Sequence, residues 1–354
     1  MKTPLVTSSR LGAVAMVLIA TWALFVVPSG GDMTLILSGS IYCAFGILAL
    51  SLALIWGFAG ILSFGQTAFF GVGGYAYAVL ALNIGNTSTA ALLAIVVAAA
   101  VAAAIGYFMF WGRLGDVYLG VITLVLTLIL YRFINQTSGS EWKIGRAPLG
   151  GFNGIPSTPI LTDLGGNPLW PEHIYVICVL ALILSYLFCR LLLATVFGRI
   201  VVALRENELR AELLGYDTRL YKLGIFTIAG GLAGLAGVLF ANCVFVSPNM
   251  FSLTTSSQLL VWVIVGGLGR LAGPVLGCFL LLAFSAWLGT LNAGSWLDPN
   301  LVMGLVLTLF VLLLPRGLLP LMQGGCDRAL AAIGRWAGTR PGATGEAMTQ
   351  EESR

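Results

Sequence analysis

The sequence predicts an all-α, polytopic membrane protein with about ten transmembrane helices. Of its 354 residues, 58% are hydrophobic and only 9% are charged, whereas about 25% of the residues of a soluble domain are charged. Residues 33–112 include no Asp, Glu, Lys or Arg, and a helical span needs only about 20 apolar residues. The apolar runs lack the alternation of β-barrel strands. Helices are therefore the remaining way to cross a bilayer.

Ten apolar segments of the sequence are candidate transmembrane helices. The eighth candidate is short and polar at its start, so a re-entrant or broken helix is the alternative there. Ten crossings place both termini on one side together with most of the basic residues, and the positive-inside rule makes that side the cytoplasm. The candidates cover residues 12–28, 33–56, 59–82, 88–110, 117–134, 173–193, 222–246, 252–268, 271–292 and 299–315.

This topology divides the chain into a cytoplasmic N-terminus at residues 1–11, a transmembrane domain at 12–321 and a cytoplasmic tail at 322–354. The longest loop on the opposite side covers residues 135–172 and is rich in Gly, Pro, Asn and Trp. Its glycines and asparagine at 149–156 predict sharp turns with positive φ angles. Because loops of this length in compact domains are often functional, we expect an external binding role, with a plain connector as the alternative.

The third candidate span is dense in glycine, which predicts either very close helix packing or a break at membrane depth. Ser63, Gln66 and Thr67 are its conspicuous polar side chains, and inside a membrane they need partners in protein or water. We predict that this span lines a solute pathway, with bridging between helices as the alternative. The predicted pathway residues are Ser63, Gln66, Thr67, Gly65, Gly71 and Gly74.

Two other sets of glycines recur every four residues, which predicts helix-packing faces. One set comprises Gly230 and Gly234, and the other comprises Gly269, Gly273 and Gly277.

Residues 197–222 form a dense polar segment between two apolar runs and carry five cations and four anions. Val202, Leu209 and Leu213 recur at helical spacing, which predicts a surface helix with one apolar stripe. Glu206 and Arg210 are spaced for an i, i+4 ion pair, and a glycine at 215 suits the end of the helix. The nearly balanced charges favour a docking surface, and a solvated loop that only orients its neighbours is the alternative.

Several function classes are excluded or disfavoured by what the sequence lacks. The basic residues are dispersed, so no nucleic-acid surface is expected. The single histidine, His173, cannot make a metal site, and no catalytic pair lies in an aqueous segment. None of the three lysines lies in a GxxxxGK[ST] loop, so any ATP must be bound by another polypeptide. The span cores lack carboxylates for a proton relay.

A series of short motifs carries a family resemblance. They stand at residues 57–75, 150–155, 198–199, 203–208, 214–215, 221–222, 233–237, 247–248, 266–269 and 273–277. In this order, over residues 40–320, the motifs resemble those of the LivM-type permeases of branched-chain amino acid ABC importers.

The resemblance implies a non-enzymatic subunit of the bacterial inner membrane that moves branched-chain amino acids by alternating access. It implies no cofactor in this chain, with ATP bound by partner chains. The implied partners are a LivH-like permease subunit in a heterodimer, two ATP-binding subunits, a periplasmic solute-binding protein and membrane lipid. The resemblance also makes 197–222 the cytoplasmic coupling segment, with ATPase-coupling residues Arg199, Arg205, Glu206, Asn207, Glu208, Arg210 and Gly215.

Alternatives remain for the solute and the mechanism. Urea and short-amide ABC permeases share most of these motifs, and residues 73–75 resemble theirs, whereas Gln66, 205–208 and 267–269 favour the amino-acid branch. Leu149 replaces the hydroxyl residue usual in that branch. An ATP-independent channel or facilitator would suit the carboxylate-free interior, and a structural scaffold subunit would lack a pathway.

Overall fold

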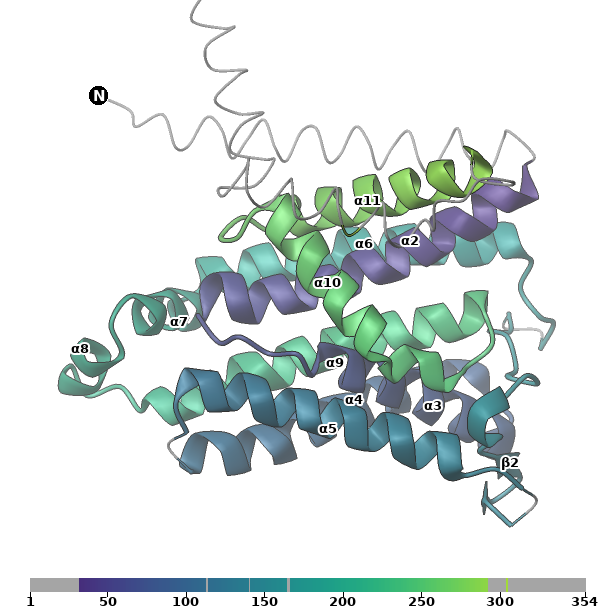
Figure 1. The fold of residues 1–354 in the computed structure, drawn as a ribbon, viewed down its shortest axis with the longest axis horizontal. Helices are drawn as coiled ribbons and strands as arrows, with labels where there is room; N and C mark the ends of the chain where they lie inside the picture. Colours follow the sequence, from purple (N-terminus) through teal and green to yellow (C-terminus); the bar gives the residue numbers. More distant parts are fainter. Residues whose placement is uncertain (1–31, 113, 140, 164–165, 292–303, 305–354) are drawn as a thin grey trace, which may run out of the picture.

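A computed structural model describes residues 32–112, 114–139, 141–163, 166–291 and 304 (Figure 1). The described part is all-α apart from one small hairpin of β1 (Lys143–Ile144) and β2 (Ala147–Pro148). Its short helices are the π-helix η1 (Ala53–Phe58) and the 3-10 helices η2 (Gly151–Asn153) and η3 (Pro248–Phe251). Its α-helices are α2 (Met33–Leu52), α3 (Gln66–Ile84), α4 (Thr87–Trp111), α5 (Asp116–Gln136), α6 (Pro171–Ala194), α7 (Val196–Glu206), α8 (Glu208–Leu213), α9 (Thr218–Cys243), α10 (Leu253–Gly266) and α11 (Ala272–Leu291).

Seven helices of the described part are long and apolar enough to cross a membrane. They correspond to α2 with η1, α3, α4, α5, α6, α9 and α11. The predicted spans 12–28 and 299–315 lie outside the described residues except for residue 304, as do the predicted termini 1–11 and 322–354. The predicted span 252–268 is the 14-residue α10, too short to qualify by itself at about 1.5 Å per residue. A total of ten spans is therefore not confirmed.

The long helices connect two ends of the molecule (Figure 1). α7 and α8 lie at one end, and the β1–β2 hairpin lies at the other. At the hairpin end, the N–H of Ile155 donates to the carbonyl of Val246 at 2.8 Å. The predicted external loop is thereby fastened to the segment between α9 and η3.

α9 is the central helix and contacts α2, α3, α4 and α6. On its α4 side, a Cβ atom added to Gly234 would overlap the Cβ of Ala98. On its α3 side, a Cβ added to Gly73 would overlap the backbone of Gly234. Between transmembrane helices, small residues allow such backbone approach and the dispersion contacts that hold the helices together. The predicted packing face of Gly230 and Gly234 is confirmed, since Gly230 likewise abuts Ala102.

The predicted third span is closely packed, and a non-helical break at residues 59–65 precedes its helix. η1 ends at Phe58, residues 59–65 are not helical, and α3 begins only at Gln66. The predicted helix start at residue 59 is therefore wrong. Gly60 has a φ of +76°, a backbone conformation that favours glycine and turns the chain away from the helix axis.

The second predicted packing face is only partly confirmed. Gly273 and Gly277 of α11 lie against the backbone of Gly266 in α10. Gly269, however, lies in the turn between α10 and α11 with a φ of +82°. The four-residue spacing of these glycines extends beyond the start of α11, so it includes one glycine of the preceding turn.

The close approach of α9 to its neighbours predicts a position-specific effect of one methyl group. A Cβ on Gly231 would lie 3.5 Å from the Cβ of Ala99, an ordinary contact, so Gly231→Ala is the control. We expect Gly234→Ala to cost about 1–3 kcal/mol by overpacking. Thermal unfolding of the purified chain in detergent should show a lower midpoint for Gly234→Ala alone, and equal midpoints for both variants would contradict this packing.

Candidate functional site

The charged segment 197–222 folds as α7, α8 and the start of α9. Thr195 caps α7, because its Oγ1 accepts a hydrogen bond from the N–H of Gly198 at 3.3 Å. α7 packs against α6, α9 and η1. Asn207 has an extended backbone, with φ −162° and ψ 101°, and its Oδ1 accepts from the N–H of Arg210 at 3.0 Å. Asn207 therefore ends α7 and caps α8, so the segment bends there.

The prediction of one helix with one apolar stripe is wrong. Leu209 and Leu213 are 67% and 81% exposed, whereas Val202 is half-buried on α7. The bend at Asn207 interrupts the helical spacing that placed these three residues on one face. The predicted helix end is confirmed: Gly215 has a φ of +88° and follows the last turn of α8.

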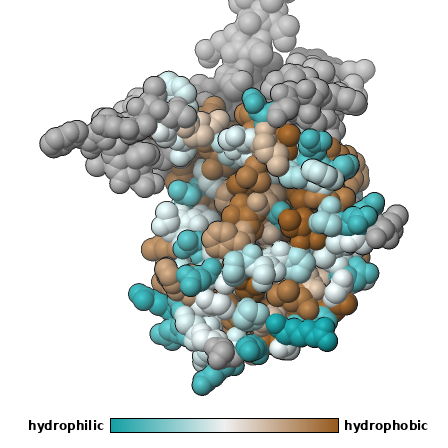
Figure 2. Space-filling model, turned by 90° about the vertical axis from the view of Figure 1, so that its right-hand side faces the viewer, coloured by the Kyte–Doolittle hydropathy of each residue, from teal (hydrophilic) through white to brown (hydrophobic). Residues whose placement is uncertain are grey.

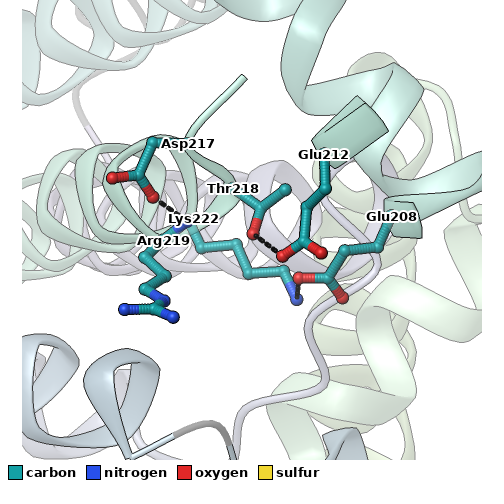
Figure 3. Close-up of polar contacts among 6 residues, drawn as sticks. All are labelled: Glu208, Glu212, Asp217, Thr218, Arg219 and Lys222. Carbon is teal, nitrogen blue, oxygen red and sulfur yellow. Dashed lines mark hydrogen bonds and ion pairs between the residues drawn. The ribbon is translucent and has the colours of Figure 1, made fainter. Parts of the chain in front are cut away.

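Polar side chains of α8 and of the first turn of α9 point toward one another (Figure 3). The Lys222 Nζ lies 2.6 Å from the Glu208 Oε1. The Thr218 hydroxyl donates to the Glu212 Oε1 at 3.2 Å. These two contacts fasten α8 to the start of α9, and they are the only polar side-chain links between the two helices in the described part of the chain.

The other predicted coupling residues divide into two groups. Arg199, Glu206 and Arg210 are exposed, and the predicted Glu206–Arg210 pair is wrong, since the described residues contain only the ion pair of Glu208 with Lys222. Arg205 is exposed as well, but part of its side chain contacts the backbone of η1. Its Nη1 donates a hydrogen bond to the backbone carbonyl of Gly57.

A pocket of ≈ 310 Å³ opens between α8, α9 and the connection from α4 to α5. Its lining combines acidic and basic side chains with apolar ones. The lining residues are Phe110, Leu114, Gly115, Glu208, Glu212, Thr218, Arg219 and Lys222.

The polar residues of the predicted pathway are completely buried between helices of this chain. Thr67 Oγ1 lies 2.5 Å from the hydroxyl of Ser256 on α10. Gln66 Oε1 accepts from the hydroxyl of Ser51 at 3.2 Å, but its Nε2 has no hydrogen-bond partner among the described residues. Ser63 Oγ accepts from the N–H of Gly65 at 3.1 Å. The structure thus places Gln66 and Thr67 where they bridge α2, α3 and α10, whereas Ser63 bonds within the segment that precedes α3.

The pathway glycines are also packing positions. A Cβ on Gly65 would lie 3.0 Å from the Cβ of Thr123 on α5. Gly71 abuts the ring of Phe251 in η3, and a Cβ on Gly74 would lie 2.6 Å from the Cε of Met250. α3 therefore contacts η3 through Gly71 and Gly74, and Gly65 lies against α5 just before α3 begins.

Sequence reasoning missed one polar residue that connects three parts of the structure. Asn242 of α9 is buried, and its Oδ1 accepts from the Tyr77 hydroxyl of α3 at 3.0 Å and from the N–H of Leu161 at 2.8 Å. An isolated amide within the apolar run of α9 was the available signal. For metals, the described residues contain no group of three or more His, Cys, Asp or Glu that could hold an ion.

Comparison with known proteins gives consistent similarities. The family model described as "Branched-chain amino acid transport system / permease component" matches residues 34–314. The high-affinity branched-chain amino acid transport system permease protein LivM of Escherichia coli is 30% identical over 296 residues, covering 78% of this chain and 68% of that protein. The probable branched-chain amino acid transport permease protein LivM of Methanocaldococcus jannaschii is 25% identical, covering 77% and 90%. An autoinducer 2 import system permease protein, LsrC of Salmonella typhimurium, is 30% identical over 36% of this chain and 38% of its own length. No solved structure matches.

The unpartnered amide of Gln66 generates a stability prediction. A buried donor without a partner costs about 1–3 kcal/mol, so Gln66→Leu should unfold at the same temperature as the unchanged protein or a higher one. Thr67→Val breaks the contact with Ser256 and should cost about 0.5–1.5 kcal/mol. Thermal unfolding in detergent compares the two variants. A lower midpoint for Gln66→Leu than for Thr67→Val would mean that Nε2 has a partner in the folded protein.

Proposed function

Because the chain belongs to the branched-chain amino acid transport permease family, we propose that it carries branched-chain amino acids across the bacterial inner membrane as one permease subunit of an ABC importer. As a family member it is a multi-pass membrane protein and a transport subunit, not itself catalytic. The observation that carries the proposal is the family match along residues 34–314.

Membership of the family places the chain in an ABC transporter complex. We propose a heterodimer with a LivH-like permease subunit, two ATP-binding subunits on the cytoplasmic side and a periplasmic solute-binding protein outside. Coupling segment 197–222 meets the ATP-binding subunits. Exposed charges at Arg199, Glu206 and Arg210, together with the exposed leucines of α8, support this docking surface.

The opposite end of the molecule receives the binding protein in this proposal. Figure 2 views that end, where apolar side chains reach the surface between hydrophilic ones. Phe152 in η2 is 75% exposed and Trp170 is 74% exposed. Exposed aromatic residues on a loop that is fastened at Ile155 suit a protein interface, because aromatic anchors are enriched at such interfaces.

Transport proceeds by alternating access. ATP binding closes the ATPase dimer, the coupling segment moves with it, and the spans rearrange. The pathway residues Ser63, Gln66 and Thr67 are buried in the present conformation, so the pathway opens when α3 and α10 separate. Separation would free the polar groups of Gln66, Thr67 and Ser256 to contact a solute.

Another class of solute is a specific alternative to branched-chain amino acids. The relative named as an autoinducer 2 import permease means that related sequences occur in importers of other solutes. Import of urea or short amides, suggested by residues 73–75, is therefore tested beside import of leucine.

Solute uptake tests the proposed function. Proteoliposomes with this chain and its co-purified partners should accumulate labelled leucine only with ATP and the binding protein. Accumulation of labelled urea instead would assign the chain to the neighbouring branch. Uptake without ATP would identify a channel or facilitator and overturn the proposal.

Charge reversal tests the docking surface. Glu206→Lys and Glu208→Lys should each reduce solute-stimulated ATPase activity about tenfold, while the permease still inserts in the membrane at normal yield. Because Glu208 also pairs with Lys222, the double variant Glu208→Lys with Lys222→Glu restores the internal pair alone. Stimulation should stay low in the double variant. Full recovery of the stimulation in the double variant would mean that Glu208 acts only through its pair with Lys222.

A further inference from the structure

The break between η1 and α3 leaves a backbone carbonyl, that of Gly57, able to accept a hydrogen bond from a side chain. In a continuous α-helix the carbonyl of Gly57 would accept from the N–H of Ile61. Here that N–H donates to Ile55 at 3.1 Å. The buried Gly57 carbonyl accepts from the guanidinium of Arg205 on α7, which lies 148 residues away in the sequence. A buried carbonyl needs such a partner.

The rest of the Arg205 side chain fits against two turn glycines. Gly60 has a φ of +76°, and a Cβ there would lie 3.0 Å from the Cγ of Arg205. Gly269 has a φ of +82°, and a Cβ there would lie 3.8 Å from the Arg205 Nη1. A Cβ on Gly57 would in turn lie 3.1 Å from the N of Gly269. Around Arg205, α7, the broken span and the α10–α11 turn therefore meet.

These two turns belong to helices that also meet in the interior. α3 follows the break and α10 precedes the Gly269 turn. Thr67 of α3 contacts Ser256 of α10 at 2.5 Å. A displacement of α7 that moves Arg205 acts on both elements that hold this contact. A charge-assisted hydrogen bond is roughly twice as strong as a neutral one, which suits a single side chain that must carry such a movement.

We propose that Arg205 is a positioning residue that transmits movement of α7 to the broken span and to the α10–α11 turn. This inference rests on the proposed function for its role in transport, but the contact itself is testable separately. It assigns the guanidinium of Arg205 to a contact within the permease, whereas the exposed side chains of Glu206 and Arg210 face the ATPase.

Hydrogen exchange tests the contact in the assembled complex. Arg205→Ala should accelerate amide exchange in residues 59–65 about tenfold, because loss of the guanidinium releases the turn. Arg205→Lys keeps one donor and should restore most of the protection. Arg190 is an exposed arginine of α6, and Arg190→Ala is the matched control with unchanged exchange. Unchanged protection in Arg205→Ala would overturn the proposal.

Solute uptake and solute-stimulated ATPase activity together test the transmission. Arg205→Ala should lower both about tenfold, because coupling between two sites is reciprocal and both effects cross the same contact, and Arg205→Lys should recover both. Unchanged uptake, or loss of co-purification of the ATP-binding subunits with the Arg205→Ala permease, would overturn the transmission role, the second by placing Arg205 at the ATPase interface. If the unchanged complex takes up solute without ATP, the proposed function fails, whereas the exchange measurement still decides whether Arg205 holds the turn.

Discussion

The close backbone approach of α3, α4 and α9 is the constraint on which this structure depends. In lipid, apolar side chains gain little by leaving their surroundings, so helices associate through dispersion contacts and a few polar bonds. α9 achieves both: its glycines admit Ala98 and the backbone of Gly73, and Asn242 joins it to α3 and the external loop. Lys222, with its ion pair, lies near the start of α9, and Asn242 lies near its end. This tightly packed helix therefore connects the end of the molecule that carries α7 and α8 to the end that carries the external loop.

The break before α3 has a cost that local hydrogen bonds offset. Non-helical backbone in a packed interior leaves polar groups that need hydrogen-bond partners. In this segment, the N–H of Ile61 donates to Ile55 at 3.1 Å, and the N–H of Phe64 donates to the Thr123 hydroxyl at 3.1 Å. The partners come from η1 and α5, so the broken segment is supported from both sides.

Composition and spacing were sufficient for part of this architecture. The charge-free run of residues 33–112 predicted helical spans, and Gly230 and Gly234 predicted a packing face, because both depend on local sequence alone. The bend at Asn207 was missed, since a capping residue inside a helical pattern does not disturb the average periodicity. The contact of Arg205 with Gly57, Gly60 and Gly269 could not be predicted, because these glycines are distant from it in sequence. The same limit applied to Ser256 and Asn242, whose partners only the folded chain brings near.

The bend at Asn207 has a consequence for how such permeases diversify. α7 is embedded against α6, α9 and η1, whereas α8 is a six-residue tip fastened by the ion pair of Glu208 and the Thr218–Glu212 bond. Exposed residues of the tip such as Leu209 and Leu213 can therefore be exchanged without repacking any span. Under the proposed function, the residues that select the ATP-binding subunit are then separate from those that form the solute pathway. A change of ATP-binding subunit therefore needs only a few surface substitutions in α8.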